Sequence, residues 1–135
     1  MTPQSKIRIL VVDDTELARK EICRILTNLG YTNIETGDDG LRALHLLKQG
    51  VESGQPFKLV ICDWAMPNVT GLDVLKEIRK DATLLSPAFI MVTAEAGLAN
   101  VVEALNLGAS DYVIKPVAPS LLQKKIERIV SRLAL

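Results

Sequence analysis

The chain has 135 residues, of which 48% are hydrophobic and 4% aromatic, and this is the size and composition of one globular domain with a sizeable core. Lys and Arg number 16, as do Asp and Glu, and this zero net charge argues against a general nucleic-acid binder, which would carry a basic excess. The apolar stretches are only as long as strands and the N-terminus lacks the layout of a secretory signal, so we expect no membrane segment and a cytoplasmic protein.

Short apolar runs alternate along the chain with segments of helical period, which is typical of repeated βα units around a parallel sheet. The first six residues are expected to lead directly into the first strand. Residues 51–56 are interpreted as a polar loop, long for this kind of unit. In chain order, the pattern predicts a strand at 7–12, a helix at 17–29, a strand at 33–36, a helix at 41–49, a strand at 59–62, a helix at 72–78, a strand at 88–92, a helix at 101–107, a strand at 112–114 and a helix at 122–133.

This alternation predicts one domain over residues 1–135, with an α/β fold and a doubly wound (βα)5 parallel sheet. Right-handed crossovers place helices on both faces of such a sheet. The second strand is short and polar, which suits an edge and favours the strand order 2-1-3-4-5, with a switch point between strands 1 and 3. Cys23 and Cys62 match no metal or redox spacing, so we expect buried free thiols in a reducing cytosol and no disulfide.

Four of the predicted strands end in polar side chains that could act on a phosphate. Asp13 and Asp14 follow the first strand and Asp63 the third, while Thr93 follows the fourth and Lys115 the fifth. Ligands bind outside the carboxyl ends of the strands in such a sheet, so these groups are expected to converge. Alone, the Asp pair would be interpreted as a helix cap, the Thr as a strand residue and the Lys as a solvated strand end. Their common place at four strand ends favours a shared phosphoryl site.

Three converging carboxylates need a cation. Two carboxylates about 4 Å apart repel each other by roughly 4 kcal/mol at an effective dielectric constant near 20. Oxygen ligation of this kind suits Mg²⁺ or Mn²⁺. Asp63 could be a ligand, a nucleophile that forms an aspartyl-phosphate, or both. Lys115 would then pair with phosphoryl oxygens, and Thr93 would donate a hydrogen bond to them.

Sequence motifs spread over nearly the whole chain point to one family. They are Val-Val-Asp-Asp at 11–14, Cys-Asp-Trp-Ala-Met-Pro-Asn at 62–68, Gly-Leu at 71–72, Val-Thr-Ala-Glu-Ala at 92–96 and Gly-Ala-Ser-Asp-Tyr-Val-Ile-Lys-Pro at 108–116. With these motifs the chain resembles response-regulator receiver domains, and among them the CheY-like single-domain chemotaxis regulators. The resemblance implies a flavodoxin-like fold with the strand order given above, which is the order known for CheY itself.

The resemblance implies a phosphorylatable switch of a two-component system of the chemotaxis type. Asp63 would accept a phosphoryl group from the phosphohistidine of a CheA-like histidine kinase. Asp14 and Asp63 would bind Mg²⁺ through their side chains, Asp13 through water, and Ala65 through its backbone carbonyl. Such a protein catalyses only its own phosphorylation and dephosphorylation, so it is not expected to be an enzyme in the ordinary sense.

The resemblance also implies how the phosphoryl group would be sensed. Thr93 and Lys115 would bind the phosphoryl group. Tyr112 would turn inward as Thr93 moves toward that group. Ala65 and Glu95, each two positions beyond an active-site residue, would influence how fast the acyl phosphate hydrolyses. The peptide bond between Lys115 and the proline after it is expected to be cis.

The expected output surface departs from the chemotaxis pattern. Regulators of this type that bind the flagellar switch carry a basic pair just after Thr-Ala-Glu-Ala, where this chain has Gly97-Leu98-Ala99. We therefore expect a monomer whose surface over 101–107, 112–114 and 122–133 selects partners by shape more than by charge. The candidate partners besides the kinase are a flagellar switch protein and a phosphatase, with no nucleic acid and no membrane.

Other functions stay open at this point. The chain could be a phosphate sink, a receiver that does not act on the motor, or a receiver cut from a longer regulator. An aspartate-nucleophile phosphatase of the haloacid-dehalogenase type is less favoured, because it places Asp-x-Asp after its first strand and here the acids are adjacent. A flavodoxin-like cofactor carrier is disfavoured because Asp13 and Asp14 would repel a flavin phosphate.

Overall fold

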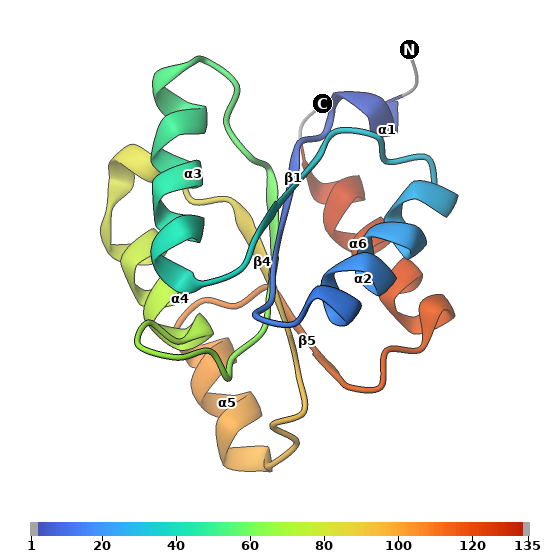
Figure 1. Cartoon of the computed structure of the whole chain (residues 1–135), viewed down its shortest axis with the longest axis vertical. Coiled ribbons are helices and arrows are strands. Elements are labelled where there is room, and N and C mark those ends of the chain that lie inside the picture. The colour runs from blue at the N-terminus through green and yellow to red at the C-terminus, as the bar shows by residue number, and fades with distance from the viewer. Residues whose placement is uncertain (1–2, 134–135) are drawn as a thin grey trace.

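The computed structural model describes residues 3–133, so residues 1–2 and 134–135 of the expected domain lie outside it. A parallel five-stranded sheet lies between two layers of helices (Figure 1). In chain order the elements are α1 (Pro3–Lys6), β1 (Ile9–Val12), α2 (Glu16–Asn28), β2 (Ile34–Gly37), α3 (Gly40–Glu52), β3 (Leu59–Cys62), α4 (Gly71–Lys80), the 3₁₀ turn η1 (Ala82–Leu84), β4 (Ala88–Thr93), α5 (Leu98–Asn106), β5 (Asp111–Ile114) and α6 (Pro119–Arg132).

The strand order is β2-β1-β3-β4-β5 and all pairings are parallel, which confirms the predicted fold class and order. Burial explains the order. β1 and β3 are buried at every position because helices cover both of their faces, whereas β2 has exposed residues at Glu35 and Thr36 and lies at an edge.

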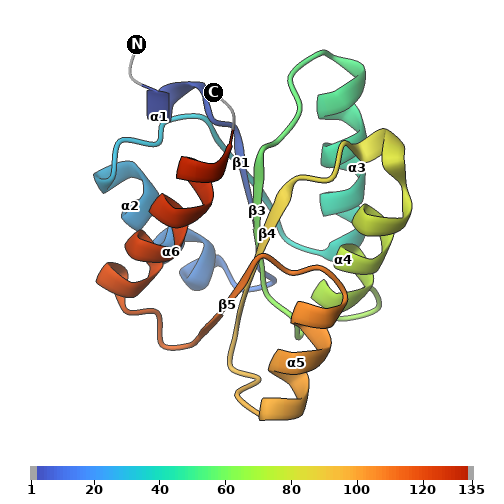
Figure 2. The same cartoon turned by 180° about the vertical axis from the view of Figure 1, so that it is seen from behind.

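Side chains of the strands alternate between two cores. Helices α3, α4 and α5 cover one face of the sheet, and α2 and α6 cover the other (Figures 1 and 2). Leu10 and Val12 of β1 pack in the first core, while Ile9 and Val11 pack in the second. No helix within residues 3–133 has the length and apolar character needed to cross a bilayer.

The N-terminal segment differs from the prediction. It was expected to lead directly into the first strand, but Pro3–Lys6 forms the short helix α1, and β1 begins only at Ile9. Proline at the first position of a helix loses no hydrogen bond, and the amide of Ile7 donates to the carbonyl of Gln4 at 3.3 Å. Ile7 is buried but lies outside the regular strand.

The end of helix α3 is a second correction. The helix was expected to end near residue 49 and a loop to cover 51–56, but the helix runs through Gly50 to Glu52. Gly50 is buried and the returning chain lies against it, with the amide of Gln55 donating to its carbonyl at 2.8 Å. The glycine therefore marks close packing here and not the end of the helix.

Arg79 at the end of α4 ties together two distant loops. Its Nε and Nη2 donate to the carbonyl of Gly108 at 3.0 and 2.8 Å. Its Nη1 donates to the carbonyl of Pro87 at 2.7 Å and to the hydroxyl of Ser86 at 3.0 Å. One guanidinium thus joins α4 to the chain entering β4 and to the chain between α5 and β5.

Candidate functional site

The switch point between β1 and β3 brings the predicted acids together. Val12 pairs with Cys62 in the parallel register, so the next residues, Asp13 and Asp63, lie side by side. Both are buried, with exposed fractions of 1% and 6%, while Asp14 is exposed. One carboxylate oxygen from each of the three acids lies within 4.8 Å of the other two. Their spacing suits a divalent cation held by oxygen ligands.

The Lys115 ammonium lies between two of these carboxylates. Its Nζ donates to Oδ2 of Asp13 at 2.7 Å and to Oδ2 of Asp63 at 3.2 Å. The Lys115–Pro116 peptide bond is cis, as expected. The lysine therefore supplies positive charge at the carboxyl ends of β1 and β3, although it follows β5 in the sequence.

The charge of Lys115 is fixed over a wide pH range. Burial by itself would lower the pKa of Lys115, but hydrogen bonding and charge interaction with Asp13, together with those of Asp63, outweigh it. The pKa therefore lies above its ordinary value of 10.5. A raised folded-state pKa stabilises the fold fully below 10.5, and this contribution is lost as the pH rises through the folded-state pKa. At neutral pH the group is an ammonium.

Asp13 is held from two sides. Its Oδ1 accepts hydrogen bonds from the amide and the hydroxyl of Thr15 at 3.0 and 3.1 Å, and its Oδ2 accepts from Lys115. Its backbone carbonyl accepts from Nη1 of Arg19 at 2.7 Å. Sequence reasoning missed both Thr15 and Arg19 as parts of the site. Thr15 is the N-cap of α2, and a capping hydroxyl just after the Asp pair was an available signal.

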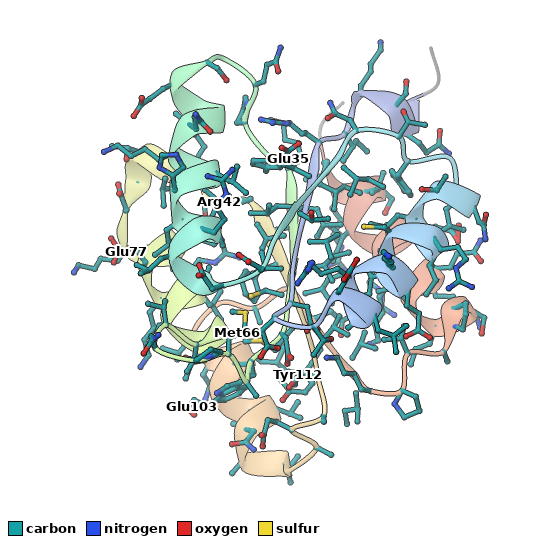
Figure 3. All side chains as sticks on the ribbon, viewed as in Figure 1. Glu35, Arg42, Met66, Glu77, Glu103 and Tyr112 are labelled. Atoms are coloured by element: carbon teal, nitrogen blue, oxygen red, sulfur yellow. The ribbon has the colours of Figure 1, made fainter. Side chains whose placement is uncertain are left out.

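The predicted switch residues form a chain of contacts at the end of β4. Thr93 is buried, and its hydroxyl accepts from the amide of Glu95 at 3.3 Å. The Tyr112 hydroxyl donates to the Glu95 carbonyl at 2.5 Å. Tyr112 is 8% exposed and lies with Met66 near the carboxyl end of the sheet (Figure 3). Burial, followed by the charges of Glu95 and Asp63, raises the pKa of Tyr112, so the phenol stays a donor.

The loop after Asp63 folds back tightly on that residue. The amide of Ala65 donates to Oδ1 of Asp63 at 3.3 Å, and the amide of Gly71 donates to the carbonyl of Trp64 at 2.9 Å. A Cβ atom at Gly71 would lie 2.0 Å from the backbone oxygen of Asp63, so only glycine fits. Ala65 is exposed beside the acids, where its carbonyl was expected to bind the metal.

The two cysteines are free, as predicted, but only Cys62 is buried as expected, whereas Cys23 is partly exposed. Burial, reinforced by the charges of Asp63 and Asp13, raises the pKa of the Cys62 thiol well above 9.0. Cys23 is only partly buried; burial raises its pKa as well, but less, and the charge of Arg19 opposes the shift. We therefore expect a disulfide reagent at pH 8 to modify Cys23 in the folded protein and Cys62 only after unfolding, because thiolate and access are both needed. Cys23→Ser should remove the native-state reaction; two equally fast thiols in the wild type would contradict this.

Comparison with known proteins agrees with this geometry. The family described as "Response regulator receiver domain" matches residues 9–127. The chain is 39% identical to chemotaxis protein CheY-3 of Vibrio cholerae over 127 residues, covering 94% of each protein. It is 40% identical to chemotaxis protein CheY of Pseudomonas aeruginosa over 126 residues, covering 93% of this chain and 98% of that protein.

Solved structures are similar in the same way. A CheY-like receiver domain protein from Methanospirillum hungatei has a TM-score of 0.80 and 31% identity, covering 93% of this chain and 94% of the other. A CheX–CheY–BeF3–Mg²⁺ complex from Borrelia burgdorferi has a TM-score of 0.81 and 25% identity, covering 91% and 88%. The sequence resemblance is thus confirmed: the chain belongs to the family of response-regulator receiver domains, the phosphorylatable switches of two-component signalling.

Proposed function

We propose that this chain is the phosphorylatable switch of a chemotaxis-type two-component system, with Asp63 accepting a phosphoryl group from the phosphohistidine of a CheA-like histidine kinase. The observation that carries the proposal is the buried Asp63 carboxylate at the end of β3, hydrogen-bonded to the Lys115 ammonium and clustered with two further acids. Similarity to chemotaxis proteins over 93% or more of this chain supports the chemotaxis assignment.

The chemistry would be carried by the chain's own carboxylate. An oxygen of Asp63 attacks the phosphorus, the bond from phosphorus to the donor nitrogen breaks, and an acyl phosphate remains on the side chain. Lys115 would then pair with the phosphoryl oxygens as a fixed positive charge. Ala65 and Glu95, both exposed beside the site, would influence how water reaches the acyl phosphate during hydrolysis.

The donor set fits Mg²⁺, or Mn²⁺ in its place. Asp14 and Asp63 would hold the ion through their side chains and Ala65 through its carbonyl. Asp13, whose oxygens accept hydrogen bonds from Thr15 and Lys115, would contact the ion through water. The bound ion would neutralise negative charge as the phosphoryl group transfers.

The switch would start at Thr93. If Thr93 moves toward a phosphoryl oxygen to donate a hydrogen bond, Glu95, whose amide donates to the same hydroxyl, would move with it, and Glu95 carries the carbonyl that accepts from Tyr112. The position of the Tyr112 ring would therefore follow the phosphorylation state. A change of this kind alters signalling only through partners that bind the two states with different affinities.

We propose that output uses an apolar surface on α5, β5 and α6. Leu98, Val102 and Leu105 lie one turn apart on α5 and are exposed, and Ile114 and Leu121 are exposed on the next two elements. On α6, the Lys125 ammonium already binds the Asp111 carboxylate at 2.7 Å, which reduces the positive charge available to an acidic partner. A partner with an apolar helix would suit this surface, and a flagellar switch protein or a phosphatase is the proposed class.

We further propose that the protein acts as a cytoplasmic monomer. It would bind neither nucleic acid nor membrane, and its zero net charge, without a basic excess, supports this second point. A phosphate sink is the second candidate, because the basic pair used for motor docking is replaced by Gly97-Leu98-Ala99.

Titration with a flagellar-switch peptide tests the proposed output. Beryllofluoride with Mg²⁺ should raise the affinity as a phosphoryl mimic. Binding should stay weak and change little between low and high salt, because few exposed ion pairs are available for screening. Binding that is tight and strongly salt-sensitive would show that Lys124 and Arg128 supply the missing charge. An affinity that beryllofluoride leaves unchanged would favour the phosphate sink.

A further inference from the structure

The loop that follows Asp63, residues 64–70, lies against the N-terminal end of α3 (Figure 1). The contact is made by Gly40, the first residue of that helix, which is buried. A Cβ atom at Gly40 would lie 2.5 Å from the backbone oxygen of Val69 and 2.6 Å from its Cγ1, whereas ordinary contacts begin at 3.4 Å. A methyl group here would therefore have to displace the loop or the helix.

Helix α3 is held by its cap and by its core contacts. Its N-cap Asp39 accepts from the amide of Arg42 at 2.7 Å, and its buried residues Ala43, Leu46 and Leu47 pack into the core under the sheet. The loop at Val69 is only partly buried. An added methyl at the start of α3 is therefore expected to move the loop and leave the helix in place.

A shift at Val69 would reach the acids. The loop is a compact coil in which the amide of Val69 donates to the carbonyl of Pro67 at 2.8 Å and the amide of Met66 donates to the carbonyl of Trp64 at 3.0 Å. Its first turn contains Ala65, whose amide donates to Oδ1 of Asp63. Moving the coil would move both this donor and the Ala65 carbonyl.

We propose that Gly40 is a positioning residue for the phosphoryl and metal site. By letting α3 approach Val69 closely, it sets the place of the loop, and through the loop the place of the Ala65 carbonyl and of the Asp63 carboxylate. Gly40 touches neither reacting group. The inference rests on the proposed function, since it concerns binding of Mg²⁺ by these residues. Loss of a partner that orients a metal ligand commonly weakens metal affinity by about 10- to 100-fold.

Helix α3 supplies a matched control at its other end. Gly50 is also buried in this helix, and a Cβ atom there would lie 2.9 Å from the backbone oxygen of Gln55. Each Gly→Ala change adds one methyl group to α3, and in each case that methyl group is forced against a backbone carbonyl oxygen. Only the change at Gly40 presses on the loop that carries Ala65.

The experiment compares the wild type with Gly40→Ala and Gly50→Ala in three measurements. Mg²⁺ affinity is measured by Trp64 fluorescence, stability by urea unfolding, and the metal-free loop by the amide NMR shifts of Trp64 and Ala65. Gly40→Ala should raise the Kd for Mg²⁺ roughly tenfold or more and move the two amide shifts. Gly50→Ala should leave the Kd within about twofold and the shifts in place, whatever its effect on stability.

Each other outcome is decisive. Equal Mg²⁺ affinity in Gly40→Ala and the wild type would overturn the positioning role and leave the proposed function intact. Similar weakening by Gly50→Ala would also overturn it, because general loss of stability would then explain both. A wild type that does not bind Mg²⁺ would overturn the proposed function as well. If Gly40→Ala does not fold, Val69→Ala, which loosens the same contact from the loop side, should still raise the Kd, and an unchanged Kd would overturn the role.

Discussion

Replacing Asp63 with Asn should abolish formation of the acyl phosphate. The amide lacks the nucleophilic carboxylate, which in the wild type is buried at the end of β3 and accepts a hydrogen bond from Lys115 at 3.2 Å. We expect labelling to fall by a factor of about 100 or more, to the limit of detection. The measurement is incubation with acetyl phosphate and Mg²⁺, followed by the intact mass before and after hydroxylamine, which cleaves an acyl phosphate.

The fold should survive this change, because Asn and Asp are nearly isosteric and the side-chain oxygen can still accept from Ala65 or Lys115. Asp38→Asn is the matched control, since that exposed acid follows β2 and lies outside the cluster of three. Its labelling should equal that of the wild type. Undiminished labelling of Asp63→Asn would place the acceptor on another residue.

Replacing Asp14 with Ala should remove the Mg²⁺ response. Of the three clustered carboxylates, Asp14 is the exposed one, and the other two share the Lys115 ammonium. Without Asp14 a direct ligand is lost and the excess of carboxylates over the Lys115 ammonium is halved, so the affinity for a divalent cation should fall by a factor of about 100 or more. Trp64 directly follows Asp63 and is the only tryptophan, so its fluorescence during a Mg²⁺ titration reports binding.

Stability without Mg²⁺ gives an independent check on the same change. Removing one of three mutually repelling carboxylates should raise the melting temperature of the metal-free protein while it lowers the stabilisation gained on adding Mg²⁺. Glu16→Ala is the control, because that acid is exposed and pairs with Lys20 at 3.0 Å outside the cluster. A Mg²⁺ titration that Asp14→Ala leaves unaltered would place the metal elsewhere.

The sequence was sufficient for the features that depend on local pattern. Buried strands are apolar at every position, as in residues 59–62, so both their place and their central position in the sheet could be predicted. The carboxyl ends of parallel strands meet at one edge of a sheet, which is why Asp13, Asp63 and Lys115 could be predicted to converge from their positions alone.

The features that the sequence did not reveal depend on contacts between distant segments. Gly50 was interpreted as the end of the helix, because glycine commonly ends helices. Periodicity does not show that another chain segment packs against this residue. Gly40 gave no signal either, since its partner Val69 is far away in the sequence. The hydrogen bond from Arg19 to the Asp13 carbonyl likewise depends on the orientation of α2 relative to β1. The sequence of the helix does not show that orientation.

The bonds of Arg79 tie the C-terminal end of helix α5 to α4. Just beyond the last turn, the Gly108 carbonyl is tied to α4 by two hydrogen bonds from the guanidinium. The first turn begins at Gly97, which offers no side-chain cap, and follows directly on the turn that carries Thr93 and Glu95. If the first turn of α5 shifts while its C-terminal end stays bound to Arg79, the helix would rotate about that end. Leu98 would then travel furthest, so a partner seated on the first turn would register phosphorylation more strongly than one seated on the last.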